Sequence, residues 1–414
     1  MTIDKKRQLR ILSVIIILDL LSATMTVPLF PIIVTDPVLT ILGPEVTKSY
    51  RLWMLTTLWV LYAFAQLIGA PFFGGLSDKY GRKKVLGAIF VLNILQYFAI
   101  AISIILQNYW LLLISRTLAG FAGGTVFIQQ SAIADLSTKK DKAKNLGIVG
   151  VAFGIGLILG PLIGTWLADS NNHPSFTLAT PFFAILIINT FNLGLLYYAF
   201  KETLTSFNSG RISLLNGFKN IYNAFKIPNW RVLFVTTTFV SAGLFFFLQF
   251  FQVMLEEKFH FGLMEQGLTL AYCGLIMVFA QGFLLPKITK YVSVERLLLF
   301  FLPTLALGYL LLSYANSIPT LLIVLTIMVS AQGICTPGVL ALISNKASDD
   351  IQGSTIGINQ SIQSFSSAIP ALLATSFVAQ NIKFPLLFGA GMTFIAFIIY
   401  YFFEYKHETK KQGE

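Results

Sequence analysis

The chain has 414 residues, of which 56% are hydrophobic and 11% are charged, and its net charge is +11. Its mean hydropathy is +0.76. Because a soluble domain carries about 25% charged residues, these values exclude an ordinary soluble protein and indicate a chain that crosses a membrane many times.

Apolar segments recur along the whole chain, and each is long enough for a spanning helix of roughly 20 residues. Backbone groups in lipid must bond within their own segment, and the alternating pattern of a membrane barrel is absent, so the segments are helices. The sequence predicts an all-α membrane protein with spans at 11–34, 53–76, 85–106, 110–134, 145–168, 180–200, 231–254, 266–286, 296–314, 318–343, 354–378 and 384–404.

Basic residues fix the expected orientation. With the N-terminus in the cytoplasm, 24 of the 29 Lys and Arg residues fall on the cytoplasmic side, and four fall on the other side. This bias is the usual mark of orientation in membrane proteins. We therefore expect a multi-pass protein with both termini cytoplasmic. The bias also explains the positive net charge without a nucleic-acid partner.

The first span contains Asp19, the only acidic residue well inside a predicted span. Asp19 lies nine residues beyond Arg10, which corresponds to ~13 Å into the membrane. A charge at that depth is costly, so the side chain should face a cavity or a partner. A structural hydrogen bond is the alternative role.

The loop after the second span reads Gly74-Gly75-Leu76-Ser77-Asp78-Lys79-Tyr80-Gly81-Arg82-Lys83. It resembles the loop signature of the major facilitator superfamily, G-x-L-[AS]-D-[RK]-x-G-R-[RK], at every position. The resemblance implies two pseudo-symmetric six-helix bundles and transport by alternating access. It also implies that Gly74, Asp78, Gly81 and Arg82 form a conformational latch with Asp135 at the end of the fourth span. An exposed loop acid is the plain alternative for Asp135.

In the fourth span, Arg116 begins a stretch that resembles the superfamily's motif for proton coupling. The expected partner of Arg116 is Asp19, because the free-energy cost of a charge inside a bilayer falls when an opposite charge lies beside it. Snorkelling of the arginine toward the outer interface is the alternative.

The fifth span carries the glycines Gly150, Gly154 and Gly160 followed by Pro161. Small residues four apart permit close helix packing, and the proline bends the helix. The pattern resembles the Gly-Pro motif of the superfamily's antiporters, which include drug and tetracycline exporters. Helix packing without a bearing on transport direction is the alternative.

The chain is expected to divide into an N-terminal bundle at 1–200, a cytoplasmic linker at 201–230, and a C-terminal bundle with a tail at 231–414. Within the linker, apolar residues fall at helical spacing over 211–226. This pattern predicts an amphipathic helix, either on the inner leaflet or packed under the bundle.

By the same resemblance, a substrate cavity should lie between the two halves. Its candidate residues are neutral amides and one phenyl ring, which suit a bulky amphipathic molecule. The same amides also bond helices together in any bundle. The candidates are Gln129, Gln130, Gln249, Gln252, Gln332, Asn359, Gln363 and Phe246.

Enzyme chemistry has no support, because the three histidines form no metal-ligand spacing and the two cysteines no disulfide framework. No cofactor and no metal is expected. The leading interpretation is a proton-coupled exporter of a small amphipathic compound, acting as a monomer in a bacterial inner membrane. Uptake of a nutrient or metal chelate, and a membrane sensor that transports nothing, are the alternatives.

Overall fold

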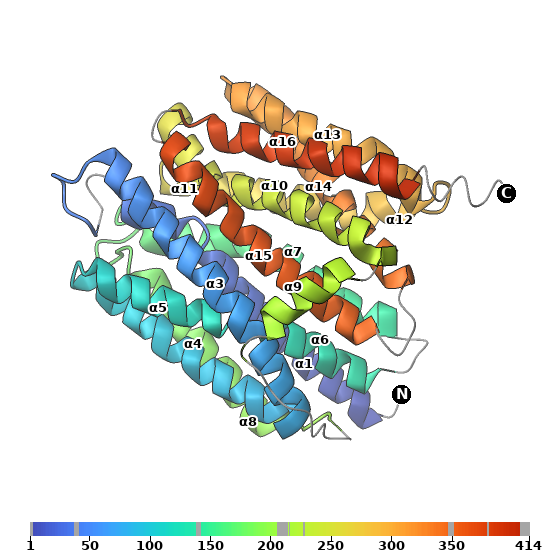
Figure 1. Cartoon of the computed structure of the whole chain (residues 1–414). Coiled ribbons are helices and arrows are strands. Elements are labelled where there is room, and N and C mark those ends of the chain that lie inside the picture. Colours follow the sequence, from blue (N-terminus) through green and yellow to red (C-terminus); the bar gives the residue numbers. More distant parts are fainter. Residues whose placement is uncertain are drawn as a thin grey trace. The chain divides into compact units, whose positions relative to one another are not determined.

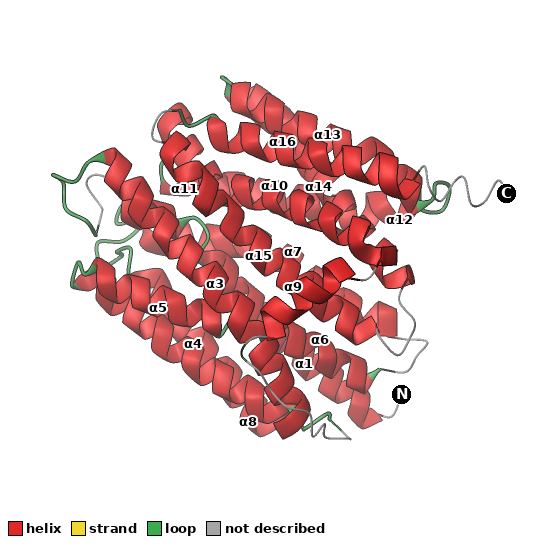
Figure 2. Cartoon of the chain, viewed as in Figure 1, coloured by secondary structure: helices red, strands yellow, loops and turns green. Residues whose placement is uncertain are grey.

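The computed structural model describes residues 3–36, 41–137, 142–204, 214, 216–226, 228–346, 352–378 and 381–405. Helices account for the regular structure of these ranges, and no strand occurs in them (Figure 2). The chain divides into two compact units. Unit 1 comprises Met1–Asn216 and Gly262–Gly274, and unit 2 comprises Gly217–Phe261 and Leu275–Glu414.

Eight helices make up most of unit 1, and they run from blue to green in Figure 1. α1 packs against α7 and α8, α3 against α5, and α4 against α8. The bounds are α1 Ile3–Met25, α2 Leu29–Thr35, α3 Lys48–Tyr80, α4 Arg82–Ile105, α5 Tyr109–Phe121, α6 Thr125–Leu136, α7 Lys142–Ala168 and α8 Thr180–Ala199.

Unit 2 is built around α10, which contacts α14, α15 and α16, while α13 packs against α14 and α16. Two short π-helical segments, η1 and η2, interrupt or extend its helices. The bounds of the helices that follow α8 are α9 Asn216–Lys226, α10 Pro228–Phe259, α11 Leu263–Phe279, η1 Ala280–Leu284, α12 Leu285–Ile288, α13 Val294–Tyr314, α14 Ile318–Lys346, α15 Gln352–Val378, α16 Phe384–Ile399 and η2 Tyr400–Tyr405. α11 is divided, since its residues up to Gly274 belong to unit 1.

Within the described ranges, eleven helical segments are long and apolar enough to cross a membrane. The remaining predicted span, 354–378, corresponds to α15, a helix of 27 residues. It carries the polar residues Asn359, Gln360 and Gln363. The prediction of an all-α membrane protein is confirmed.

Two predicted spans are each made of two helices. The first breaks between Met25 and Leu29, and the fourth breaks between Phe121 and Thr125. Pro28 and Pro31 stand at the first break, and Gly123 and Gly124 stand at the second. A proline lacks the backbone N–H that continues a helix, and glycine adopts irregular turns at low cost, so both breaks follow from local chemistry.

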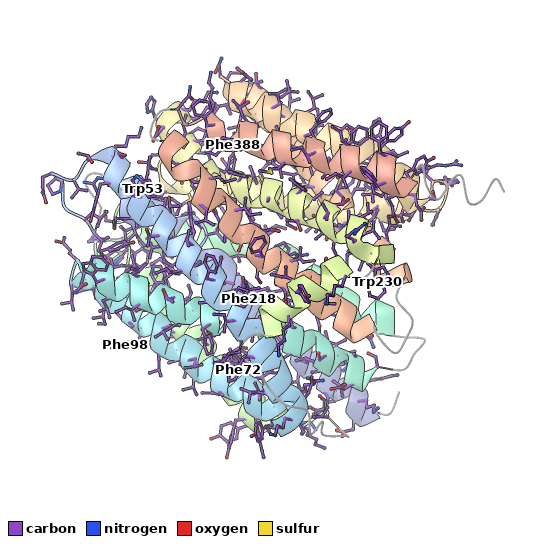
Figure 3. The ribbon with its side chains drawn as sticks, in the orientation of Figure 1. Trp53, Phe72, Phe98, Phe218, Trp230 and Phe388 are labelled. Carbon is purple, nitrogen blue, oxygen red and sulfur yellow. The ribbon has the colours of Figure 1, made fainter. Side chains whose placement is uncertain are left out.

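Apolar side chains fill both the interiors and the outer surfaces. In unit 1, Leu12, Phe90, Ile133 and Leu196 come from four different helices and are almost wholly buried. On the surface, Trp53 and Phe98 are about half exposed, at 47% and 49% (Figure 3). Large exposed apolar side chains on long helices are expected where lipid rather than water surrounds the protein.

Candidate functional site

The charged loop predicted as a latch is organised around Arg82, the first residue of α4. Arg82 is only 8% exposed. Its Nη1 lies 2.6 Å from Asp78 Oδ1, and its Nε lies 3.3 Å from Asp135 Oδ2. Nη1 also donates to Ser77 Oγ at 2.6 Å. One guanidinium therefore joins the ends of α3, α4 and α6.

Glu202, which follows α8, is a further member of this network that the sequence did not reveal. Its Oε1 accepts a hydrogen bond from the backbone N–H of Arg82 at 2.8 Å, and its Oε2 accepts one from Lys83 at 3.1 Å. The first N–H groups of a helix have no partner inside the helix, and negative charge is favourable there. Glu202 therefore caps α4 from a position 120 residues away.

The turn between α3 and α4 depends on Gly81, whose φ is +101°. A Cβ at this position would lie 2.8 Å from Glu202 Cδ, which is closer than real Cβ contacts. Thr203, next to Glu202, donates its hydroxyl to Asp135 Oδ2 at 3.3 Å. Gly74 makes no comparable contact, since a Cβ there would meet nothing within 4 Å.

Asp19 lies on α1 and is 8% exposed. Gln129 Nε2 on α6 donates to its Oδ2 at 2.9 Å. The other amide atom, Gln129 Oε1, is buried and has no partner among the described residues. Asp19 was predicted to carry the coupling proton, and Gln129 was predicted to line the substrate cavity. The two side chains are therefore hydrogen-bonded to each other within unit 1.

Arg116 lies on α5, where its guanidinium stands between two aromatic rings. Its Cζ is 4.2 Å from the ring centroid of Phe30 and 4.1 Å from that of Tyr62. Its Nε is buried without a partner among the described residues, and no ion pair between Arg116 and Asp19 occurs in the described parts of the chain. Two aromatic rings, rather than the Asp19 carboxylate, therefore lie against this guanidinium.

The glycines of α7 pack against α1. A Cβ on Gly160 would lie 2.8 Å from Thr24 Cβ and 2.9 Å from the backbone nitrogen of Met25. Thr24 Oγ1 donates across the same contact to the carbonyl of Gly156 at 2.7 Å. Gly154 is buried, whereas a Cβ on Gly150 would meet open space.

Pro161 stands inside α7, and its missing N–H leaves the carbonyl of Leu157 without the usual helical donor. Residues 263–274 of α11, which belong to unit 1, approach this point. A Cβ on Gly274 would lie 2.9 Å from the carbonyl carbon of Leu157, and a Cβ on Gly267 would lie 3.2 Å from the oxygen of Pro161. The sequence did not indicate these two glycines.

The remaining cavity candidates of unit 1 and unit 2 differ in their burial and in whether their amide groups have hydrogen-bond partners. Gln130 on α6 is partly exposed. Gln249 on α10 donates to the carbonyl of Ser367 on α15 at 2.8 Å, whereas both amide atoms of Gln252 are buried and unpartnered. Phe246 is fully buried and stacks on Phe388 of α16, with ring centroids 5.8 Å apart.

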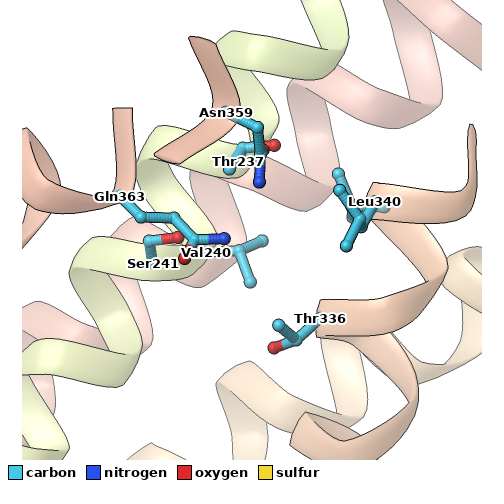
Figure 4. Close-up of a pocket in the computed structure, with 8 residues that line it drawn as sticks. Thr237, Val240, Ser241, Thr336, Leu340, Asn359 and Gln363 are labelled. Atoms are coloured by element: carbon cyan, nitrogen blue, oxygen red, sulfur yellow. The ribbon is translucent and has the colours of Figure 1, made fainter. Parts of the chain in front are cut away.

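A pocket in unit 2 collects several of the predicted polar residues (Figure 4). Asn359 and Gln363 line it from α15, Thr237 and Ser241 line it from α10, and Thr336 lines it from α14. Its empty volume is about 250 Å³, some of which opens to solvent. The space open to a water-sized group is far smaller, about that of one water, so the pocket takes a single small polar group.

Gln332 does not line this pocket but is hydrogen-bonded to Thr336, which does. It is 3% exposed, its Oε1 accepts from the hydroxyl of Tyr309 at 2.8 Å, and its Nε2 donates to Thr336 Oγ1 at 2.6 Å. Across the described ranges, no cluster of three or more His, Cys, Asp or Glu side chains could hold a metal ion.

Comparison with known proteins decides the family. The family model of the Major Facilitator Superfamily matches residues 12–371, and again 291–414. The chain belongs to the Major Facilitator Superfamily. It is a transporter rather than an enzyme, and the resemblance drawn from the loop signature is confirmed.

Among relatives, the chain is 27% identical over 419 residues to the class H tetracycline resistance protein of Pasteurella multocida, covering 97% of both chains. It is 25% identical to the quinolone resistance protein NorA of Staphylococcus aureus strain MSSA476, covering 98% of both. The crystal structure of the human organic anion transporter MFSD10 (TETRAN) superposes with a TM-score of 0.72 at 20% identity, covering 96% of this chain and 99% of that one. The D-xylose-proton symporter gives 0.76 at 15%, covering 96% and 98%. The structural matches show the shared fold.

Proposed function

We propose that this protein exports a small amphipathic organic molecule in exchange for protons. Tetracycline and quinolone resistance proteins are relatives along nearly the whole chain, which supports efflux. A bacterial inner membrane, cytoplasmic termini and action as a monomer belong to the same proposal. The neutral amides and phenyl rings of the cavity candidates suit an amphipathic substrate.

The buried carboxylate of Asp19 is the observation that carries the proposal. It lies inside the first span with one hydrogen bond, from Gln129. A carboxylate in such a site is costly when charged and readily takes up a proton when water reaches it. Alternating access exposes the site to one side at a time, so Asp19 binds a proton from outside and releases it inside.

Arg116 supports this cycle through its charge. The rings of Phe30 and Tyr62 have centroids 4.2 and 4.1 Å from the guanidinium carbon, and such contacts stabilise a cation. The fixed positive charge favours the ionised form of Asp19 in whichever state brings the two groups nearer. Rearrangement between states thereby changes the affinity of Asp19 for its proton.

The network of Asp78, Arg82 and Asp135 serves as the latch of one conformational state. Its ion pairs join three helix ends at the face with most basic residues. A latch must form and break during each cycle, and this network has partly exposed carboxylates that water can reach: the side chains of Asp78 and Asp135 are 47% and 26% exposed, while Arg82 is buried.

The test is drug flux in proteoliposomes under an imposed pH gradient, with tetracycline and a quinolone as the compounds. Asp19→Asn should abolish gradient-driven flux, while Asp19→Glu should retain part of it with a displaced pH optimum. Asp4→Asn is the matched control, because Asp4 lies on the same helix and is exposed. Full gradient-driven flux in Asp19→Asn would refute proton carriage by this residue.

The same assay separates export from uptake. Inside-out vesicles of an exporter accumulate drug when their interior is acid, and a nutrient importer of the same fold gives the opposite direction. A membrane sensor gives no flux in either orientation.

A further inference from the structure

The pocket of unit 2 contains a polar group that lacks a hydrogen-bond partner among the described residues. Asn359 is 4% exposed, and its Oδ1 is buried with no hydrogen bond. A buried amide atom that loses water without gaining a partner costs about 1–3 kcal/mol. This cost is recovered when a ligand supplies the missing partner.

On the opposite wall, the relay from Tyr309 through Gln332 fixes how Thr336 presents its hydroxyl. Tyr309 donates to the oxygen of the Gln332 amide, which turns the NH₂ group toward Thr336. The Thr336 oxygen thus accepts from Gln332, and its own proton has no acceptor among the described residues. The hydroxyl is left as a donor toward the pocket that it lines (Figure 4).

Every residue that lines this pocket is uncharged. An uncharged site binds a neutral hydrogen-bonding group more favourably than it binds an ion, because an ion would lose its hydration without gaining a counter-charge. The pocket has room for about one water-sized polar group, so it takes a single functional group and neither a ring nor a whole drug.

We propose that this pocket is the subsite that binds a neutral hydroxyl, enol or carboxamide group of the substrate. Thr336 donates to the oxygen of that group, and Asn359 pairs with its hydrogen. Tyr309 and Gln332 are positioning residues that set the direction of the Thr336 hydroxyl. The assignment rests on the proposed function, since it names the chemistry that the exporter selects.

The geometry predicts a specific dependence on Tyr309, although Tyr309 does not line the pocket. Without its hydroxyl, the Gln332 amide loses the bond that orients it and can turn over. Its oxygen would then accept the Thr336 proton, and the pocket would lose its donor. Removing the hydroxyl of Tyr309 should thus imitate removal of the Thr336 hydroxyl.

The experiment measures equilibrium binding to the purified full chain in nanodiscs without a pH gradient. The probes are tetracycline, which carries hydroxyl, enol and carboxamide groups, and tetraphenylphosphonium, a bulky aromatic ion without hydrogen-bonding groups. Thr336→Val and Tyr309→Phe should each weaken tetracycline binding by about three- to tenfold, the value of one neutral hydrogen bond. Neither should change tetraphenylphosphonium binding.

Three further variants sharpen the result. Thr336→Ser keeps the hydroxyl and should bind as the wild type does. The double variant Tyr309→Phe/Thr336→Val should bind no more weakly than Thr336→Val alone, because both changes remove the same donor. Thr238→Val is the matched control, since Thr238 lies on α10, bonds only to its own helix and does not line the pocket.

Two outcomes would overturn the subsite. One is a wild-type protein that binds tetracycline no better than tetraphenylphosphonium. The other is a set of variants that weaken both probes equally or neither. Because no gradient is imposed, these results are independent of flux through Asp19, so failure of the subsite is distinguishable from failure of proton-coupled export.

Discussion

The carboxylate of Glu202 occupies the space that a side chain at Gly81 would fill. Gly81 has a backbone conformation that L-residues rarely adopt, and Glu202 closes over it to bind the N–H groups of Arg82 and Lys83. The turn, the cap and the ion pairs of Arg82 are thus one structure, in which each part requires the others.

A side chain at position 81 should therefore disturb the latch. Gly81→Ala places a methyl group against Glu202 and forces a strained backbone conformation, at a cost of ~1–3 kcal/mol. We expect lower thermal stability in detergent and loss of most transport. Gly74→Ala is the matched control, because a Cβ there meets nothing. Equal behaviour of the two variants would contradict this account of the turn.

Loss of the Asp78 charge should impair transport while membrane insertion is preserved. Asp78→Asn removes one of the two carboxylates that bind the Arg82 guanidinium. We expect at least several-fold slower flux at equal expression. Ser77→Ala is not a neutral control, since Ser77 also accepts from Arg82. Lys79→Gln is a better one, because Lys79 is exposed and its ammonium lies over the ring of its neighbour Tyr80.

Close packing of α7 on α1 should depend on Gly160 and not on Gly150. Gly160→Ala pushes a methyl group into Thr24, and overpacking of this kind costs ~1–3 kcal/mol. Thermal unfolding in detergent should show a lower midpoint for Gly160→Ala and an unchanged one for Gly150→Ala. If both variants unfold alike, the contact between α1 and α7 does not set stability.

The spans and the charged loop could be predicted from sequence because both are local signals. Hydropathy marks a span wherever it lies, and Asp78 and Arg82 are four residues apart on one short segment. Glu202 could not be found in this way, because its contact with Arg82 crosses 120 residues. The pairing of Arg116 with Phe30 and Tyr62 was missed for the same reason. A charge inside a bilayer needs a partner, but sequence does not say whether a carboxylate or an aromatic face supplies it.

The orientation remains a prediction that rests on the distribution of Lys and Arg. α13 separates Tyr291 from Asn316, and both of these residues are exposed. Cysteines at the two positions should therefore react with an impermeant maleimide from opposite sides, with Tyr291→Cys protected in intact cells. Cys273 and Cys335 are buried and should not react with the maleimide. Labelling of both positions from one side would contradict the predicted topology.

Gln129 should tune the pH dependence of transport through its bond to Asp19. Gln129→Met keeps the length of the side chain and removes the N–H group that donates a hydrogen bond to the Asp19 carboxylate. Hydrogen bonds to charged groups contribute about 1.5–3 kcal/mol, so loss of this bond should displace the pH profile of flux from that of the wild type.

The control for this change is another buried amide of the same unit. Gln96→Met removes a side chain that donates to Asn93 and not to Asp19. We expect this variant to keep the wild-type pH profile, even where its maximal flux falls. A general loss of packing would lower flux in both variants at every pH, whereas loss of the Asp19 bond moves the profile of Gln129→Met alone. An unmoved profile in Gln129→Met would separate Asp19 from the proton that drives transport.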